Sequence, residues 1–137
     1  MMFQLKKQDY DEILAHALTN LPNEACGMLG GQMGGEVKTV EKVYLLTNVD
    51  QSPEHFSLNP KEQFAVIKDI RSWNGVLLGN FHSHPASPSR PSEEDKRLAY
   101  DPEVSYLILS LQDTEHPVMK SFRIKRTEVF EEELQII

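Results

Sequence analysis

The sequence predicts a mixed α/β (α+β) fold in which a central β-sheet is sandwiched by helices. Two amphipathic segments have the period of helices, and several apolar or β-branched runs have the length of strands. These segments alternate along the chain, an order typical of sheets covered by helices. With 137 residues, the chain has the size of one compact domain, and we expect residues 1–137 to form a single domain.

The first helix is predicted for residues 9–21, where apolar side chains recur at helical spacing. Asp9 and Glu12 have the spacing of a capping box at its start. His16 lies off the apolar stripe, so we expect it at the solvated surface without a functional role.

Two strands are predicted to follow as a hairpin. Residues 24–31 are small and apolar, and residues 37–46 form a long β-branched segment. Gly34 and Gly35 between them are expected to supply the turn.

A second helix is predicted to begin at Pro60 and to end near Asn74 and Gly75. Asn59 is its expected N-cap, and Pro60 occupies the first helical position, where a backbone N–H is not needed. Apolar residues are expected along one side of this helix: Phe64, Ile67, Ile70 and Trp73.

The remaining elements are predicted from two continuous apolar runs and their surroundings. Residues 76–82 and 104–111 have the length and composition of strands covered on both faces. A third helix is expected between them, at residues 92–100. Residues 118–126 and 128–137 are expected to close the fold as a pair of strands.

Composition excludes several classes of function. The net charge of −7 disfavours a general affinity for nucleic acid, which needs a basic surface. No apolar run approaches the roughly 20 residues of a membrane helix, and the first residues lack the features of a secretory signal. The one cysteine, Cys26, cannot form an internal disulfide. We therefore expect a cytoplasmic protein that binds neither membranes nor nucleic acid.

The stretch "GNFHSHPASPSRPSEEDKRL", residues 79–98, contains two of the five histidines of the chain. In a strand, His82 and His84 project from the same face and can reach one point. The end of an apolar strand is a poor place for two imidazoles unless something binds both. The helix expected at residues 92–100 turns Asp95 toward the core, and an inward carboxylate also needs a partner.

Two imidazoles and one carboxylate, with a position left open for water, form the ligand set of a catalytic zinc site. Such a site also needs a group that accepts a proton and a donor that holds the developing oxyanion. Glu24, a lone carboxylate at the start of an uncharged strand, is the candidate for the proton shuttle. Ser92, one helical turn before Asp95, is the candidate for the donor.

These residues resemble the motif of the JAMM/MPN+ zinc metallopeptidase family, which reads H-x-H, seven residues, S, two residues, D, with a Glu upstream. The similarity extends from about residue 3 to residue 112. The resemblance implies the cytidine-deaminase-like JAMM/MPN fold, and it implies that His82, His84 and Asp95 bind zinc. It also implies that Glu24 activates the metal water and that Ser92 steadies the oxyanion.

Members of this family cleave peptide or isopeptide bonds at the Gly-Gly tail of ubiquitin or ubiquitin-like proteins, and small bacterial relatives act on sulfur-carrier proteins. The chain is similar to the small stand-alone prokaryotic type. The resemblance thus implies a metallopeptidase whose partner is a small ubiquitin-like (β-grasp) sulfur carrier. A channel between the Glu24 strand and residues 85–91 is expected to accept the tail, because glycine permits close approach of the backbone.

Other interpretations stay open at this point. The chain could be an interaction module of the same fold that lacks catalysis, or an Fe(II) enzyme, since two histidines and a carboxylate also hold iron. Ser92 and Asp95 could act only as a helix cap. Cys26 and His55 could lie near the metal or could have purely structural places, and the oligomeric state is not predicted.

Overall fold

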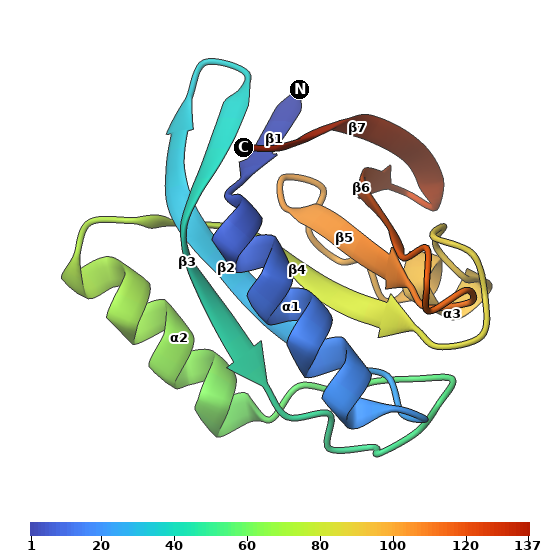
Figure 1. Cartoon of the computed structure of the whole chain (residues 1–137). Helices are drawn as coiled ribbons and strands as arrows, with labels where there is room; N and C mark the ends of the chain where they lie inside the picture. Colours follow the sequence, from blue (N-terminus) through green and yellow to red (C-terminus); the bar gives the residue numbers. More distant parts are fainter.

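The computed structural model describes residues 1–137 and contains seven strands and three helices (Figure 1). In chain order the elements are β1 (Met2–Leu5), α1 (Lys7–Asn20), β2 (Cys26–Gly34), β3 (Val37–Leu46), α2 (Pro60–Ser72), β4 (Val76–His84), α3 (Glu93–Arg97), β5 (Ser105–Ser110), β6 (Val118–Lys125) and β7 (Glu128–Ile136). None of the helices is long and apolar enough to cross a membrane.

The strands form one mixed sheet in the order β1-β3-β2-β4-β5-β6-β7. The β2–β3 hairpin and the β2–β4, β5–β6 and β6–β7 pairs are antiparallel, whereas β4 and β5 are parallel. The short β1 pairs in parallel with both β3 and β7 and so closes the sheet into a barrel. Figure 1 shows this closure where the two ends of the chain lie close together.

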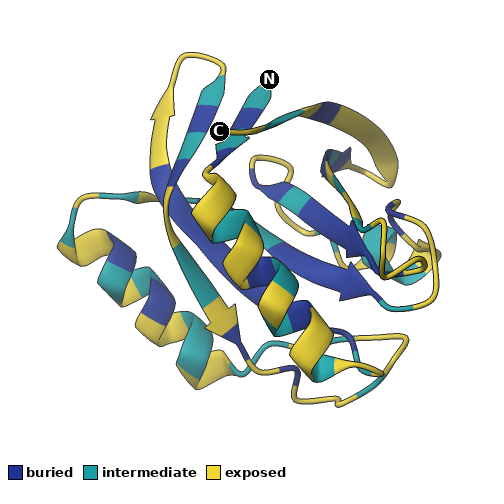
Figure 2. Ribbon diagram, in the orientation of Figure 1, coloured by how far each residue is buried: buried dark blue, intermediate teal, exposed yellow.

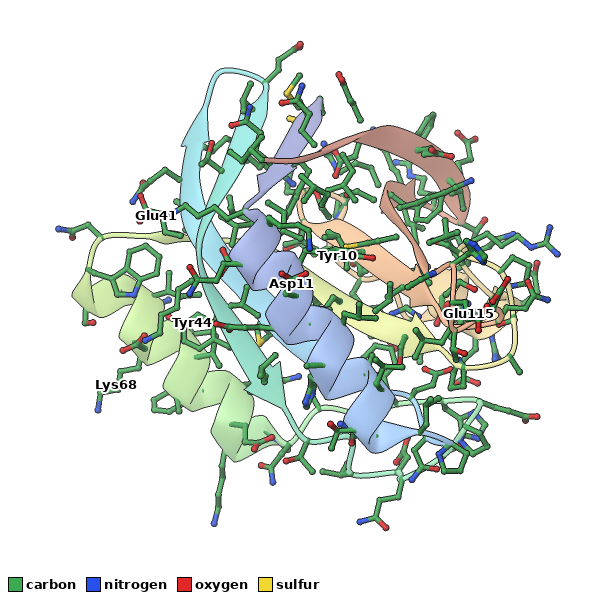
Figure 3. The ribbon with its side chains drawn as sticks, viewed as in Figure 1. Tyr10, Asp11, Glu41, Tyr44, Lys68 and Glu115 are labelled. Atoms are coloured by element: carbon green, nitrogen blue, oxygen red, sulfur yellow. The ribbon has the colours of Figure 1, made fainter.

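Helices α1 and α2 cover opposite faces of the sheet. Alternate residues of β2 point to opposite sides, so Leu29 packs in the cluster that contains Ile13 of α1, whereas Met28 packs in the cluster that contains Ile70 of α2. Strands β4 and β5 between these layers are mostly buried (Figure 2). Polar side chains such as Asp11 of α1 and Lys68 of α2 lie exposed on the outer sides of the helices (Figure 3). The predicted mixed sheet between helices is confirmed.

The second helix follows its predicted signals closely. The Asn59 side chain accepts a hydrogen bond from the Lys61 N–H at 2.9 Å, and Asn74 adopts a φ of 58° just beyond the helix end. Phe64, one of the four apolar residues predicted along one side of this helix, is however 70% exposed. Val66 lies about 160° around the helix from Phe64, and Val66 is the residue that packs against the sheet.

The first helix differs from the prediction at its start and along one side. It begins at Lys7, and its N-cap Lys6 makes no side-chain cap, so the predicted capping box of Asp9 and Glu12 is wrong. His16 is half-buried, and its Nε2 lies 3.2 Å from the Cys26 carbonyl oxygen and 3.1 Å from that of Leu46. The expectation of a solvated His16 is therefore wrong, because the ends of β2 and β3 lie under this side of α1.

Two shorter elements also differ from the prediction. Strand β1 was not predicted, because four residues are too few to show a period and the strand depends on pairing with distant segments. Helix α3 spans only Glu93–Arg97 instead of residues 92–100. Leu98 is 49% and Tyr100 82% exposed, so the residues beyond Arg97 lack the buried apolar contacts that would stabilise a longer helix.

Candidate metal centre

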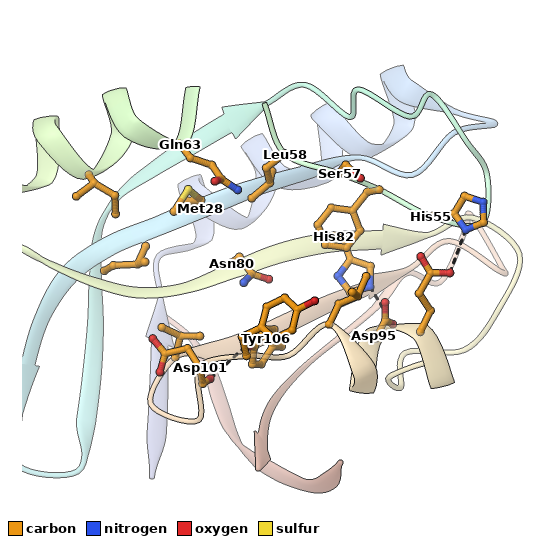
Figure 4. Close-up of a pocket in the computed structure, with 17 residues that line it drawn as sticks. Met28, His55, Ser57, Leu58, Gln63, Asn80, His82, Asp95, Asp101 and Tyr106 are labelled. Atoms are coloured by element: carbon orange, nitrogen blue, oxygen red, sulfur yellow. Dashed lines mark hydrogen bonds and ion pairs between the residues drawn. The ribbon is translucent and has the colours of Figure 1, made fainter. Parts of the chain in front are cut away.

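His82 and His84 at the end of β4 and Asp95 in α3 converge on one point. The two Nε2 atoms are 3.1 Å apart, and Asp95 Oδ2 lies 3.2 Å from His82 Nε2 and 3.1 Å from His84 Nε2. Both imidazoles are buried. Figure 4 shows the Asp95 carboxylate directed at the ring of His82. The convergence expected from the sequence is thus present in the folded chain.

The start of α3 fixes the orientation of the Asp95 carboxylate. Ser92 is the N-cap: its Oγ accepts a hydrogen bond from the Asp95 N–H at 3.0 Å, and its own N–H donates to Asp95 Oδ2 at 2.9 Å. This is a capping box, and the oxygen that it holds is the one that faces the imidazoles. The backbone therefore positions the carboxylate without help from a long helix.

The two imidazoles are oriented by different contacts. His84 donates its Nδ1–H to the Pro88 carbonyl oxygen at 2.9 Å, which leaves its Nε2 lone pair for the point of convergence. His82 stacks on the ring of Phe56, with the ring centres 4.6 Å apart, and its Nδ1 is buried without a hydrogen-bond partner. Each ring thus presents Nε2 to the same point.

The arrangement fits a tetrahedral zinc ion. With bonds of about 2.0–2.1 Å, the ligand atoms of such an ion are about 3.3 Å apart, close to the 3.1–3.2 Å separations observed here. Although burial acts in the opposite direction, the imidazoles of His82 and His84 hold the pKa of the Asp95 carboxyl well below its usual range. Burial alone would lower the pKa of His84, yet its contacts with Asp95 and Pro88 raise it. The site therefore favours an ionised Asp95 carboxylate opposite positive charge.

Glu24 lies just before β2 and is buried, with 4% of its surface exposed. Its Oε1 has no hydrogen-bond partner. Burial raises the pKa of Glu24 to about 8, while His84 acts to lower it and Asp95 to raise it. Positive charge held at the convergence point would lower this pKa, so a buried carboxylate that is free of bonds and within electrostatic reach of that point is placed to accept a proton.

Ser83 connects this glutamate to the histidines and was not singled out from the sequence. Its side chain points to the opposite face of β4, where Oγ accepts a hydrogen bond from the Ala25 N–H at 2.8 Å, and its N–H donates to the Ala25 carbonyl at 3.0 Å. The strand that carries both histidines is therefore fixed to the residue that follows Glu24. A serine between two histidines gives no sequence signal for this role.

Asn48 organises the segment on the other side of Glu24 and was also missed. Its buried amide donates to the carbonyl oxygens of Glu24 at 3.0 Å and His55 at 2.9 Å, and its Oδ1 accepts from the N–H groups of Asp50 and Ser57. This amide holds the loop that carries Phe56 and His55. No local pattern distinguishes such an asparagine from an ordinary turn residue.

A cavity of about 540 Å³ opens beside His82 and Asp95. It does not include Glu24 or residues 85–91, so the channel expected between them stays a prediction. Glu24 is buried, and Ser89 of that segment is buried against β5 through a 2.6 Å hydrogen bond to the Ile108 carbonyl. The cavity lies instead along β4, between α2 and the chain from α3 to β5, and includes these residues among its walls: Met28, Leu58, Gln63, Ile67, Asn80 and Tyr106 (Figure 4).

The two residues without an assigned role have different places. His55 lines the cavity and contacts Glu94 of α3, with Nδ1 and Oε2 3.1 Å apart (Figure 4). Cys26 is fully buried in the cluster beneath α2, and burial raises the pKa of its thiol to about 12. The thiol is therefore neutral near pH 7.

Comparison with known proteins identifies relatives over most of the chain. The family described as prokaryotic homologs of the JAB domain matches residues 6–125. The CysO-cysteine peptidase of Mycobacterium tuberculosis is 32% identical over 125 residues, which cover 91% of this chain and 84% of that protein. The desampylase of Haloferax volcanii is 34% identical over 105 residues, 73% of this chain and 74% of that protein. A protein from Desulfitobacterium hafniense with a known solution structure is 56% identical, with a TM-score of 0.91 over 100% of this chain and 93% of that one.

Proposed function

Because the chain belongs to the family of prokaryotic homologs of the JAB domain, we propose that it is a zinc-dependent peptidase. Its substrate is the C-terminal Gly-Gly tail of a small ubiquitin-like or sulfur-carrier protein, from which it releases the attached group by hydrolysis of a peptide or isopeptide bond. In this proposal residues 1–137 act as one catalytic domain in the cytoplasm.

The observation that carries the proposal is the convergence of three ligand atoms, all within 3.1–3.2 Å of one another. In this proposal His82, His84 and Asp95 hold the zinc ion. Zinc supplies a Lewis acid that activates water near neutral pH. An interaction module without catalysis gives no reason for a carboxylate and two imidazoles to be held so close together at the edge of a cavity.

Two other residues of the site have separate roles: Glu24 transfers protons, and Ser92 stabilises negative charge. Glu24 accepts the proton of the attacking water at its unpaired Oε1 and returns it to the nitrogen of the leaving amine. Ser92 Oγ accepts a hydrogen bond from the Asp95 N–H and so has its own O–H free to donate to the developing oxyanion.

Likeness to the relatives supports the choice of substrate. One relative is a CysO-cysteine peptidase and another a desampylase, and a third is a probable TtuB-protein conjugate cleaving protease. By analogy, we assign this chain a conjugate of a small carrier protein as its substrate.

The test is cleavage of candidate carrier proteins that bear C-terminal extensions, with the released group identified by mass spectrometry. The zinc-loaded wild-type protein is expected to cleave, Glu24→Gln to bind zinc without cleaving, and Asp95→Asn to lose both properties. Elemental analysis of the purified proteins separates zinc from iron. Full activity in both variants, or iron as the metal that supports activity, would overturn the proposal.

A further inference from the structure

Asn80 occupies the middle of the cavity floor. It pairs with Met28 of β2 on one side and with Tyr106 of β5 on the other, and all three side chains line the cavity. Asn80 is two residues before His82 on the same face of β4, so it lies one step along the floor from the metal-binding candidates. Figure 4 shows its amide directed into the cavity.

The Asn80 amide has no partner within the chain. Its Oδ1 is buried and makes no hydrogen bond, and no bond to its nitrogen is present either. Its neighbours on the floor do not satisfy it: Met28 is apolar, the Tyr106 hydroxyl donates to the Asp101 carbonyl at 3.1 Å, and His82 Nδ1, which is also without a partner, makes no hydrogen bond to this amide. Buried polar groups are almost always paired, so the partner of this amide is expected to come from outside the chain.

The walls indicate what kind of partner fits. Leu58, Ile67, Leu77 and Val104 make much of the lining apolar, and an apolar cavity with a few polar groups binds a ligand in a defined orientation. A side-chain amide offers one acceptor and N–H donors, and it is complementary to a peptide group, which has the same pair. The segment that this cavity suits is therefore an extended peptide with its main chain facing the floor.

The rise per residue of β4 sets the distance between Asn80 and the bond that is cleaved. Two residues along β4 correspond to about 6.6 Å, and an extended peptide advances by the same rise per residue. When the scissile bond lies at His82, the peptide group two residues away lies at Asn80. We propose that Asn80 binds this peptide group and thereby selects substrates with an extended segment in the cavity. This inference rests on the proposed function, because the scissile bond defines the position.

The test is a double-mutant cycle between protein and substrate. Peptides that contain the carrier tail are made with each amide near the scissile bond replaced in turn by an ester, which removes one N–H. Binding is measured by fluorescence anisotropy with the zinc-loaded Glu24→Gln protein, with and without Asn80→Leu. At one position, two residues from the scissile bond, the ester is expected to weaken binding about fivefold to tenfold. In the Asn80→Leu protein, the same ester is expected to cause no loss.

Two further measurements separate recognition from structure. Asn80→Leu removes an unpaired polar group, so its Tm is expected to equal or exceed that of the wild type. In wild-type background it is expected to raise the KM of the amide peptide about fivefold to tenfold while kcat and zinc content stay unchanged. Equal ester penalties with and without Asn80, or a marked fall in Tm, would overturn the assignment of Asn80. Binding without any cleavage by the wild type would instead overturn the proposed function.

Discussion

Ser83 Oγ accepts a hydrogen bond from the Ala25 N–H at 2.8 Å, and through this bond β4 is fixed to the residue beside Glu24. Ser83 lies between His82 and His84, so the same short segment supplies two metal-binding candidates on one face and the anchor of the proposed base on the other. The distance between base and metal centre therefore depends on a side chain that touches neither.

Replacing Ser83 with alanine should separate catalysis from metal binding. The change leaves the buried Ala25 N–H without its partner, and we expect a loss of stability of about 1–3 kcal/mol. Because Glu24 is then less firmly positioned, kcat should fall about tenfold or more, while zinc content stays at the wild-type value. Steady-state kinetics and elemental analysis measure these effects.

Ser121→Ala is the matched control for this substitution. Ser121 is also a buried strand serine, and its Oγ donates to Glu132 at 2.7 Å, on β6 and away from the metal centre. This variant should lose stability but keep its kcat at temperatures where it is folded. Equal reductions of kcat in the two variants would show that Ser83 has no special connection to the base.

Zinc should stabilise the folded chain through Asp95. A ligand that binds only the folded state at a hundred times its Kd contributes about 2.7 kcal/mol, so zinc added to the chelated wild type should raise Tm by several degrees. Asp95→Asn removes one ligand charge from the trio and should reduce this rise strongly. An undiminished rise in the variant, measured by calorimetry, would mean that zinc binds elsewhere.

The metal-binding candidates and α2 were predictable because their signals are local. A strand places His82 and His84 on one face whatever surrounds it, and Asn59-Pro60 specifies a helix start within two residues. The length of α3 was not predictable in this way. The helix is a single turn, and the capping box of Ser92 holds Asp95 in place without a longer helix.

The features that were missed depend on distant contacts. β1 exists because β3 and β7 lie beside it, and His16 is half-buried because its ring meets two strand carbonyls. The position of the cavity follows from how α2 and the segment before β5 face each other across β4. Such contacts leave no periodic pattern in the sequence from which they could be inferred.

Glu24 should make the stability of the metal-free protein depend on pH. Its pKa is about 8 in the folded chain and 4.5 in the unfolded chain, so the folded state binds this proton more tightly. The stabilisation is fully present below about pH 4.5 and is lost as the pH rises to about 8. The Glu24→Gln variant has no titratable group at this position, so its stability should not show this fall with rising pH.

Urea unfolding in the presence of a chelator measures this difference. Between pH 5 and pH 8, the free energy of unfolding of the wild type should fall by about 2–4 kcal/mol more than that of Glu24→Gln. The comparison with the variant removes the contributions of ionisable groups that do not interact with Glu24. Parallel pH profiles would show that Glu24 is not buried as the structure places it.

Lys38 of β3 is fully buried and holds one wall of the cavity. Its ammonium group donates to the carbonyl oxygens of Glu103 at 2.7 Å and Leu78 at 3.3 Å and to Ser105 Oγ at 2.8 Å. The two preceding carbonyls are held in the same way, that of Asp101 by Tyr106 and that of Pro102 by Arg123. Three strands thus fasten the segment that contributes this part of the cavity wall: Leu98, Tyr100, Asp101 and Val104.

Lys38→Met should therefore loosen the substrate cavity more than the metal centre. The variant leaves buried carbonyl groups unpaired, and we expect a loss of stability of about 1–3 kcal/mol and a rise in KM, with kcat and zinc content close to the wild type. Lys42→Met on the same strand is the control, because Lys42 is exposed and contacts only Asp69 and the Tyr44 ring at the surface. It should change neither KM nor kcat. If Lys38→Met and Lys42→Met have the same KM, or if Lys38→Met reduces kcat and zinc content together, the cavity wall does not depend on Lys38.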